Sequence, residues 1–426
     1  MQARLRRASF LDPRRDGPGL GPRVSPVSAN RTRVPRRHGR LSADRRALPG
    51  RVATIPPTTG ARMTTFGIEE EFILVDPVTL TPADVAASVH AELLGSAHGS
   101  KFVSHEFLAS QIERSSPVFT QMDQAEADLV TFRTRLAAQA RRRGVVAAGV
   151  GTPFMCSGWP AVTDTERYHR VEEEFRGLVT DHLINGTHVH VGVPTRDVGV
   201  AVLNRVRTWL PTLLALTGNS PYWHGADTGF ASWRAMHMRR WSTGGCPPPF
   251  SDAADYDRRI RRLVGVGGTY DTRTIWWNAR LAEGHPTVEV RVADAQLDTG
   301  GALLAAILVR ALVDTARAEA EADVAPLEVE PELLDAGLWH AARDGLGGEL
   351  LDPVAGELRG SREVLHRLLV HVGDALDASG DHERTRALLD RVTTDGTGAE
   401  RQRAAVRRGG PAELRRLCET ALVARA

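Results

Sequence analysis

The sequence predicts an α+β protein with a single, largely antiparallel sheet that is covered by helices on one face. Short strand-like runs alternate with long segments in which apolar residues recur at helical spacing. Three of these runs carry one apolar and one polar face, a pattern typical of an antiparallel sheet with one solvated side. No glycine-rich dinucleotide fingerprint follows a predicted strand, which argues against a Rossmann fold.

The first 62 residues differ in composition from the rest of the 426-residue chain. They hold 15 arginines and three acidic residues, are rich in Pro, Gly and Ser, and are predicted to be disordered. They lack the apolar core of a signal peptide, and an Arg-rich transit peptide is the alternative. We interpret Met63, directly ahead of the first predicted strand, as the translation start, with residues 63–426 forming one catalytic domain whose C-terminal part is helical.

Charge, hydrophobic runs and cysteine spacing argue against several classes of protein. The whole chain has a net charge of +2, but residues 63–426 carry 39 basic and 49 acidic side chains, so nucleic-acid binding is not expected. No run approaches the roughly 18 apolar residues of a membrane span. The three cysteines are too far apart for a disulfide framework or a zinc-ligand spacing. We therefore predict a cytoplasmic protein that binds neither nucleic acid nor membrane.

The predicted elements follow one another along the chain. Strands are expected at 66–75, 187–193 and 286–292, and the segment 144–154 is expected to be a buried strand that enters a Gly-Pro loop. Long helices are expected at 123–143 and 301–320, and the chain from about residue 322 onward is expected to be mostly helical.

Three predicted strands each carry chemically active side chains on one face. Because side chains alternate along a strand, each polar face contains two of these residues: Glu69 and Glu71, His188 and His190, Glu289 and Arg291. Glu70 falls on the opposite face with apolar neighbours and is expected to be structural. Ordinary solvated strand faces would also alternate, but such faces usually mix Thr, Ser, Lys and Gln.

Neighbouring carboxylates raise one another's pKa unless a cation lies between them. Glu69 and Glu71 are therefore predicted metal ligands. Oxygen-rich sites suit Mg²⁺ or Mn²⁺, and Mg²⁺ most often binds together with phosphates. Lys101, the only lysine, follows Ser100 and does not form the Gly-Lys-Ser/Thr of a phosphate-binding loop, so a nucleotide would have to bind by another route.

Glu106 and Glu113 add to the predicted cluster. Their spacing of seven would place both on one face of a helix, although the following Ser-Ser-Pro and the β-branched neighbours weaken a helix here. Two surface glutamates are the alternative. Trp276 and Trp277 are interpreted as core packing rather than as a nucleotide platform.

The segment 218–241 is rich in turns, aromatic residues and arginines. It contains Asn219 and Arg234, and a guanidinium is well suited to a planar carboxylate. This segment could hold an amino-acid carboxylate, or it could be an irregular surface loop with aromatic anchors.

Several stretches together resemble a known family. The matching stretches are GIEEEFILVDP, NGTHVHVGV, NSPYWHGADTGFASWR, IWWNARL with TVEVRVADAQ, and GTGAERQRAA. From about Met63 to the C-terminus, the chain resembles the bacterial carboxylate-amine ligases of the glutamate–cysteine ligase type 2 group. This resemblance implies a glutamine synthetase-like fold with a curved antiparallel sheet whose concave face binds ATP and magnesium.

The resemblance also implies residue roles. The implied metal ligands are Glu69, Glu71, Glu106, Glu113, His188 and Glu289. Arg291, with Glu289, would act in catalysis by balancing charge on the transferred phosphoryl group, and Arg234 and Asn219 would bind substrate. Asn185 and Thr187 depart from the family's Cys-Gly-Met/Leu-His pattern, and His224 stands where Arg is common, which leaves the amine acceptor open.

The implied activity is ATP-dependent amide formation through an acyl phosphate, with weak glutamate–cysteine ligase activity. A dedicated γ-glutamylcysteine synthetase is the alternative within the class. The His188-x-His190 pair would also suit a metal-dependent hydrolase, and a non-catalytic relative is the third alternative. Symmetric oligomers are common in the superfamily, so the resemblance makes a homodimer the expected assembly.

Overall fold

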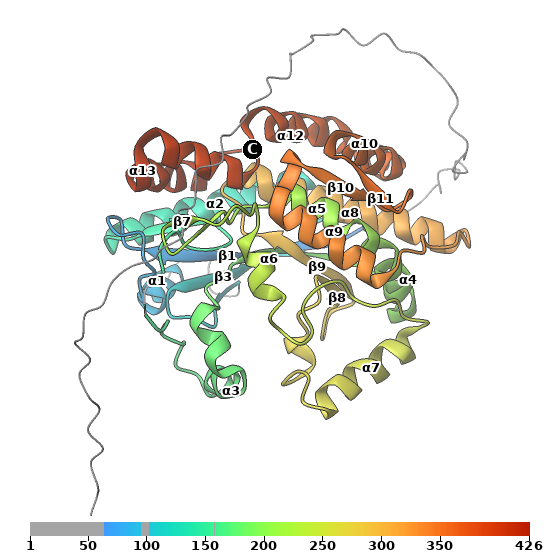
Figure 1. The fold of residues 1–426 in the computed structure, drawn as a ribbon, viewed down its shortest axis with the longest axis horizontal. Helices are drawn as coiled ribbons and strands as arrows, with labels where there is room; N and C mark the ends of the chain where they lie inside the picture. Colours follow the sequence, from blue (N-terminus) through green and yellow to red (C-terminus); the bar gives the residue numbers. More distant parts are fainter. Residues whose placement is uncertain (1–63, 95–101, 157) are drawn as a thin grey trace, which may run out of the picture. The chain divides into compact units, whose positions relative to one another are not determined.

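The computed structural model describes residues 64–94, 102–156 and 158–426 (Figure 1). All of them belong to one compact unit, Ile55–Ala426. The extension predicted over residues 1–62 lies outside the described residues. Within the described residues, the chain forms one large sheet, two small hairpins and the helices around them.

A seven-stranded antiparallel sheet forms the centre of the fold and confirms the predicted α+β class. Its order is β2-β3-β1-β5-β9-β8, with β4 also paired to β1. The strands are β1 (Phe66–Val75), β2 (Val103–His105), β3 (Gln111–Ser115), β4 (Val146–Ala148), β5 (Gly186–Gly192), β8 (Ala279–Leu281) and β9 (Thr287–Asp294). Two separate hairpins pair β6 (Tyr222–Trp223) with β7 (Ala226–Asp227) and β10 (Glu349–Asp352) with β11 (Glu357–Gly360).

Helices make up most of the remaining structure. They are α1 (Ala86–Leu94), α2 (Met122–Arg142), α3 (Glu166–Phe175), α4 (Arg196–Val206), α5 (Leu210–Thr217), α6 (Trp233–Met238), α7 (Ala253–Gly265), α8 (Thr299–Glu321), α9 (Pro331–Asp344), α10 (Ser361–His371), α11 (Gly373–Ser379), α12 (His382–Asp395) and α13 (Gly398–Leu422). The predicted helices at 123–143 and 301–320 correspond to α2 and α8 within two residues at each end.

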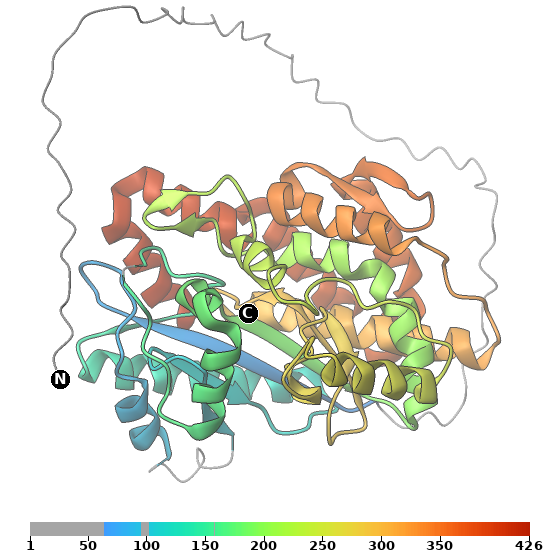
Figure 2. The same cartoon turned by 60° about the horizontal axis from the view of Figure 1, so that its bottom comes forward.

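The apolar faces of the central strands pack on these helices. Valines of β5 and β9 belong to one buried cluster with the apolar residues of α5 and α8. In Figure 2, β1 (blue) and β5 (green) run side by side in the sheet. In Figure 1, α5, α8 and α9 lie on one side of the strands and α3 and α7 on the other. The polar strand faces are therefore turned away from the main helical layer.

Helix α8 is long and apolar enough to cross a bilayer by length and composition. In this fold, however, 83% of its most apolar stretch is buried against other elements. Such burial is what a core helix requires, because a helix that is apolar on all sides must be covered by protein or lipid.

Glu70 has the structural role predicted from its strand face. It is 1% exposed, and its carboxylate accepts hydrogen bonds from the guanidinium of Arg133 on α2. The same guanidinium donates to the backbone carbonyls of Gln296 and Leu297. This buried pair joins β1, α2 and the segment that follows β9.

One expectation about elements differs from the structure. The segment 106–113 is not helical: Glu106 follows β2 and Glu113 lies in β3, because β2 and β3 pair with each other and β3 pairs with β1. As predicted, the segment 144–154 begins as a buried strand, β4, and then leaves the sheet in a loop. The part of the chain after residue 322 is mostly helical, as predicted, and includes the β10–β11 hairpin.

Candidate active site

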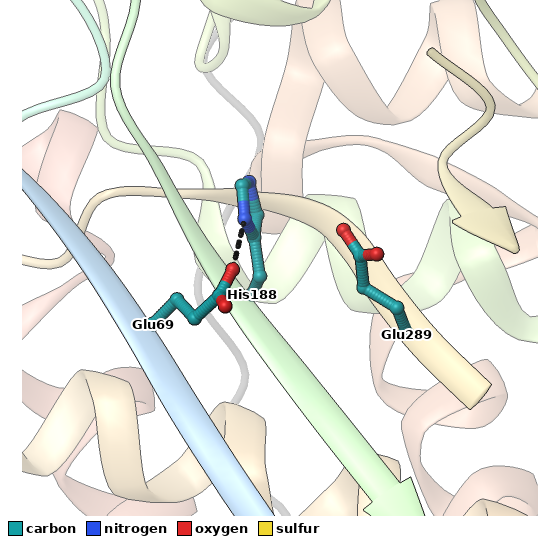
Figure 3. A group of neighbouring side chains, drawn as sticks. All are labelled: Glu69, His188 and Glu289. Carbon is teal, nitrogen blue, oxygen red and sulfur yellow. Dashed lines mark hydrogen bonds and ion pairs between the residues drawn. The ribbon is translucent and has the colours of Figure 1, made fainter. Parts of the chain in front are cut away.

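Strand pairing gathers the first group of predicted side chains. Glu69 lies opposite His188 of β5, and His190 lies opposite Glu289 of β9. Glu69, His188 and Glu289 each offer one ligand atom within 4.8 Å of the others. Figure 3 shows the three side chains projecting to the same side from three adjacent strands. The pairing of β1 with β5 and of β5 with β9 therefore brings Glu69 close to Glu289, more than 200 positions away in the sequence.

Glu69, His188 and Glu289 form the first cluster. Contacts from neighbouring side chains hold Glu69 in it. Nδ1 of His188 is 3.2 Å from Oε2 of Glu69, and Nε2 of His190 is 3.4 Å from Oε1 of Glu69. Ser115 of β3 donates its hydroxyl to Oε1 of Glu69 at 3.3 Å. Glu69 is therefore contacted from both neighbouring strands.

Three carboxylates form a second cluster beside the first. Glu71 lies opposite Glu113 of β3, and with Glu106 these residues each offer an oxygen within 4.8 Å of the others. The backbone N–H of Gly186 donates to Oε2 of Glu71 at 2.6 Å, and Ser104 donates to Oε2 of Glu113 at 2.9 Å. His188 links the two clusters, because its Nε2 is 3.6 Å from Oε1 of Glu71.

The first cluster favours ionised carboxylates. Burial opposes ionisation of Glu69, but the hydrogen bonds from His188 and His190 outweigh it and lower the pKa well below its usual value. Burial also opposes ionisation of Glu289, but Arg280 and Arg291 lower its pKa to about 2. Both carboxylates are therefore negatively charged at neutral pH.

In the second cluster, burial and mutual repulsion oppose ionisation of the carboxylates. Burial and the charge of Glu71 raise the pKa of Glu106 to about 7. Burial, Glu106 and Glu69 raise the pKa of Glu113 well above its usual value. Three close carboxylates with little cationic compensation from the protein are what a bound cation would relieve.

Arg291 is fixed beside the first cluster. Its Nη1 is 3.6 Å from Oε1 of Glu289, and its guanidinium carbon lies 5.1 Å from the ring centroid of Trp276. The ring of Trp276 also stacks on that of Trp241, with centroids 4.7 Å apart. Trp276 is thus itself held by an aromatic neighbour, and it contributes to the position of Arg291 by a cation–π contact. Trp277 is buried in the core, as predicted.

Arg234 also reaches the polar face. It lies in α6, is 2% exposed, and donates through Nη1 and Nη2 to the carbonyls of Val292 and Arg291, each at 3.3 Å. A Cβ added to Gly186 would lie 2.4 Å from Nη2 of Arg234. The guanidinium is therefore packed against the start of β5, close to His188.

Asn219 is placed differently from a substrate-binding side chain. Its Nδ2 donates to the carbonyls of Gly149 and Ala295 at 2.8 and 2.6 Å, and its Oδ1 accepts from Gln402 at 2.6 Å. With no exposed surface, it has no polar atom directed at a substrate. Both polar atoms of the Asn219 amide group form their hydrogen bonds within the protein.

The donor atoms of the two clusters fit a hard divalent cation. Carboxylate oxygens predominate, as Mg²⁺ and Mn²⁺ prefer. Nε2 of His188 is buried and has no hydrogen-bond partner among residues 64–94, 102–156 and 158–426. Buried polar atoms are normally paired, so this imidazole nitrogen is available as a ligand atom beside the carboxylates.

Sequence reasoning missed Arg280 as part of the site, and it placed His190 on the polar face without giving it a role. Arg280 of β8 donates from Nε to Oε2 of Glu289 at 2.7 Å. The signal was available for His190, which shares a strand face with His188. For Arg280 the only signal was a short alternating run after the two tryptophans, and its pairing with β9 could not be inferred from that run.

Comparison with known proteins decides the family. The sequence model of glutamate-cysteine ligase family 2 matches residues 65–420. The chain belongs to this family. It is accordingly an ATP-dependent ligase that forms an amide bond between a carboxylate and an amine.

Curated relatives are similar to this chain over most of their own length. A protein of Saccharopolyspora erythraea, provisionally named glutamate–cysteine ligase 2-2, is 40% identical over 361 residues, covering 84% of this chain and 92% of its own. One from Salinispora arenicola, provisionally named glutamate–cysteine ligase 2, is 39% identical over 350 residues, covering 82% of this chain and 92% of its own.

Solved structures share the fold at low sequence identity. Glutamate–cysteine ligase of Francisella tularensis, solved with AMP, aligns with a TM-score of 0.62 at 14% identity over 85% of this chain and 89% of that one. A bifunctional glutathione synthetase of Pasteurella multocida aligns with a TM-score of 0.60 at 14% identity over 84% of this chain and 52% of that one. The fold is therefore that of the glutamine synthetase-like ligases, as the resemblance implied.

Proposed function

We propose that this family member uses ATP and Mg²⁺ to activate the side-chain carboxylate of glutamate and to join it to an amine. The observation that carries the proposal is the meeting of two carboxylate-rich clusters on one polar sheet face, bordered by Arg291 and Arg234. A relative solved with AMP supports a nucleotide substrate.

The residues that would hold the metal are those of the two clusters. They are Glu69, His188 and Glu289 in one and Glu71, Glu106 and Glu113 in the other. Bound there, Mg²⁺ would neutralise phosphate charge, which this protein cannot do with a Gly-Lys loop. Mn²⁺ has the same ligand preference and is the alternative ion.

The reaction proceeds in two displacements. An oxygen of the substrate carboxylate attacks the γ-phosphorus of ATP, the bond to ADP breaks, and an acyl phosphate forms. The nitrogen of the amine then attacks the acyl carbon, inorganic phosphate leaves, and the ammonium proton passes to solvent. The protein supplies positioning and charge stabilisation.

Two arginines have distinct roles in this scheme. Arg291, held by Glu289 and Trp276, would face the transferred phosphoryl group and balance its charge. Arg234 would set the positive potential that receives the substrate carboxylate, since it lies directly beside Gly186 at the start of β5. Glu289 would keep Arg291 in place as well as bind metal.

Cysteine is the first amine to test, because the relatives carry names that mention it. The residues Asn185 and Thr187 around Gly186 depart from the pattern common in the family. A dedicated γ-glutamylcysteine synthetase and a ligase with only weak activity toward cysteine differ in how strongly cysteine stimulates turnover.

The test is phosphate release by the chain beginning at Met63, with ATP and Mg²⁺, against a panel of carboxylates and amines with and without cysteine. Release that depends on both glutamate and cysteine supports the proposal and names the substrates. Release with another pair keeps the chemistry and changes the substrates. Amide hydrolysis without ATP would favour a metal-dependent hydrolase, and tight Mg²⁺–ATP binding with no release would favour a non-catalytic relative.

We also propose that the enzyme acts in the cytoplasm, without nucleic acid or membrane, and that it forms a homodimer. The free thiols of Cys156, Cys246 and Cys418 support a reducing compartment. Light scattering of the purified protein measures the assembly directly, and a monomeric mass would contradict the dimer.

A further inference from the structure

A buried carboxylate at the end of β9 fastens the segment that carries Arg234. Asp294 has no exposed surface. Its Oδ2 accepts from the backbone N–H of Asn219 at 2.8 Å and from the hydroxyl of Ser220 at 2.7 Å, while its Oδ1 accepts from the hydroxyl of Ser232 at 2.8 Å. Asp294 therefore holds both ends of the stretch between Asn219 and Ser232.

The same carboxylate is the electrostatic partner of Arg234. Nη1 of Arg234 is 3.9 Å from Oδ1 of Asp294, and no other carboxylate of the described residues lies within ion-pair distance of this guanidinium. The hydroxyl of Ser220, which donates to Asp294, also accepts from the backbone N–H of Arg234 at 3.0 Å. Both the backbone and the charge of Arg234 thus depend on Asp294.

Helix α13 also contacts this network of hydrogen bonds. Nε2 of Gln402 donates to the backbone carbonyl and to Oδ1 of Asn219, at 2.9 and 2.6 Å. A Cβ on Gly398 would lie 2.2 Å from Oδ1 of Asn219, so only glycine permits this approach. Asn219 therefore connects α13 to the backbone group that Asp294 binds.

Space around Asp294 is as limited as its hydrogen bonding. A Cβ on Gly151 would lie 2.8 Å from Oδ2 of Asp294. The carboxylate therefore cannot move toward β4 and the turn that follows it. A carboxylate held by three hydrogen bonds and this close contact can transmit its own position to the guanidinium it faces.

We propose that Asp294 is a positioning residue for Arg234, with Asn219 and Gln402 as its support, and that it acts on the binding of the substrate carboxylate rather than on ATP. The proposal rests on the function proposed above. Asn219 then contributes to substrate binding through the protein, without contacting the substrate.

The physical reason is the cost of an uncompensated buried charge. Removing one partner of a buried ion pair leaves the other without compensation in a low-dielectric surrounding. Without Asp294, Arg234 would turn toward another acceptor, and Glu71 of the polar sheet face is the other carboxylate whose charge acts on it. The guanidinium would then be withdrawn from the position that receives the substrate.

The experiment compares Asp294→Asn with Asp381→Asn. Asp381 is a matched control, because it is also buried and also pairs with a buried arginine, Arg310, away from the polar sheet face. Asp294→Asn is expected to raise the KM for glutamate by about ten- to hundredfold, the range for a lost hydrogen-bonded charge interaction. The KM for ATP should change less than threefold. Asp381→Asn should lower the melting temperature and leave both KM values unchanged.

Two further variants keep the test decisive if Asp294→Asn folds poorly. Gln402→Met removes the support at α13 and should raise the KM for glutamate in the same direction by a smaller factor. Combining Asp294→Asn with Arg234→Gln should raise this KM no further than Arg234→Gln alone, because the two residues act as one unit.

The outcomes separate this inference from the proposed function. A wild-type enzyme that turns over glutamate, with an Asp294→Asn variant whose KM for glutamate is unchanged, overturns the positioning role alone. Additive effects of Asp294→Asn and Arg234→Gln overturn it as well. A wild-type enzyme that turns over no carboxylate overturns the proposed function and, with it, the role given to Arg234.

Discussion

Glu70 and Glu71 are chemically similar neighbours with opposite roles. Glu70 points into the core and pairs with Arg133, whereas Glu71 points to the polar face and meets Glu106 and Glu113. A one-residue step along a strand reverses the face. This pair therefore allows a site function and a structural function to be tested with the same substitution.

Glu71→Gln is expected to abolish ATP turnover while the fold remains intact. The amide oxygen can still accept from the backbone N–H of Gly186, so the local structure has no reason to change. The negative charge for the metal is lost. Phosphate release and the melting temperature measure the two effects, and unchanged turnover would refute the metal assignment.

Glu70→Gln is the matched control and should behave in the opposite way. It leaves the guanidinium of Arg133 buried without a full countercharge, at an expected cost of about 3–5 kcal/mol in the free energy of unfolding. Turnover per folded molecule should remain close to that of the wild type. Equal losses of turnover in both variants would mean that the two faces are not functionally separate.

The raised pKa of Glu106, about 7, predicts a pH dependence of stability in the absence of divalent metal. In the unfolded chain a glutamate releases its proton near pH 4.5, whereas folded Glu106 retains it to about pH 7. The folded state therefore binds more protons between these values, and its stability falls as pH rises through this window. Added Mg²⁺ should remove most of this loss at pH 8, because it compensates the ionised carboxylates.

The measurement is the melting temperature of metal-free wild type and of Glu106→Gln between pH 5 and pH 8. Buried histidines such as His182, whose pKa burial lowers to about 3, act in the opposite direction, but they are common to both proteins. The melting temperature of the wild type minus that of Glu106→Gln should therefore fall as pH rises. A flat or rising difference would contradict the role of Glu106.

Among the elements, α13 shows how a distant segment constrains the site. Its first residue, Gly398, lies against Asn219, and a capping box formed by Thr397 and Glu400 begins the helix. The late motif that contributed to the family resemblance is thus a docking element. Its sequence pattern gave no indication of which segment it contacts.

Gly398→Ala is expected to destabilise the protein by about 1–3 kcal/mol, because the added methyl group overlaps Asn219 and must displace it or α13. Gly373→Ala is the control: it lies at the start of α11, and no heavy atom lies within 4 Å of its added Cβ. That substitution should be neutral or slightly stabilising. Chemical denaturation of both variants measures the difference, and equal stabilities would show that α13 does not dock tightly here.

Strands were predicted more reliably than the connections between them. The face of each residue in β1, β5 and β9 followed from a period of two. The Glu106–Glu113 spacing was ambiguous, because a spacing of seven suits a helix. In the structure, Glu106 directly follows β2 and Glu113 lies in β3, the strand that pairs with β2. Only pairing of β3 with β1 brings Glu113 opposite Glu71.

For the whole molecule, the composition boundary near Met63 predicts that the N-terminal extension is dispensable. The family match begins at residue 65. The chain shortened to begin at Met63 should have the same melting temperature and turnover as the full chain. A loss of either in the shortened chain would assign a function to residues 1–62.

The sequence by itself determined the class of fold, the polar and apolar faces of three strands, the structural role of Glu70 and the family. These are local properties, because strand and helix periods are set by backbone geometry. The tertiary structure decided which strands are neighbours, that Arg280 joins the site, that His190 contacts Glu69, and that Asn219 is used within the protein. Those features depend on pairing register and on contacts across long stretches of chain, including a register shift between Thr187 and Val189, and no local pattern contains them.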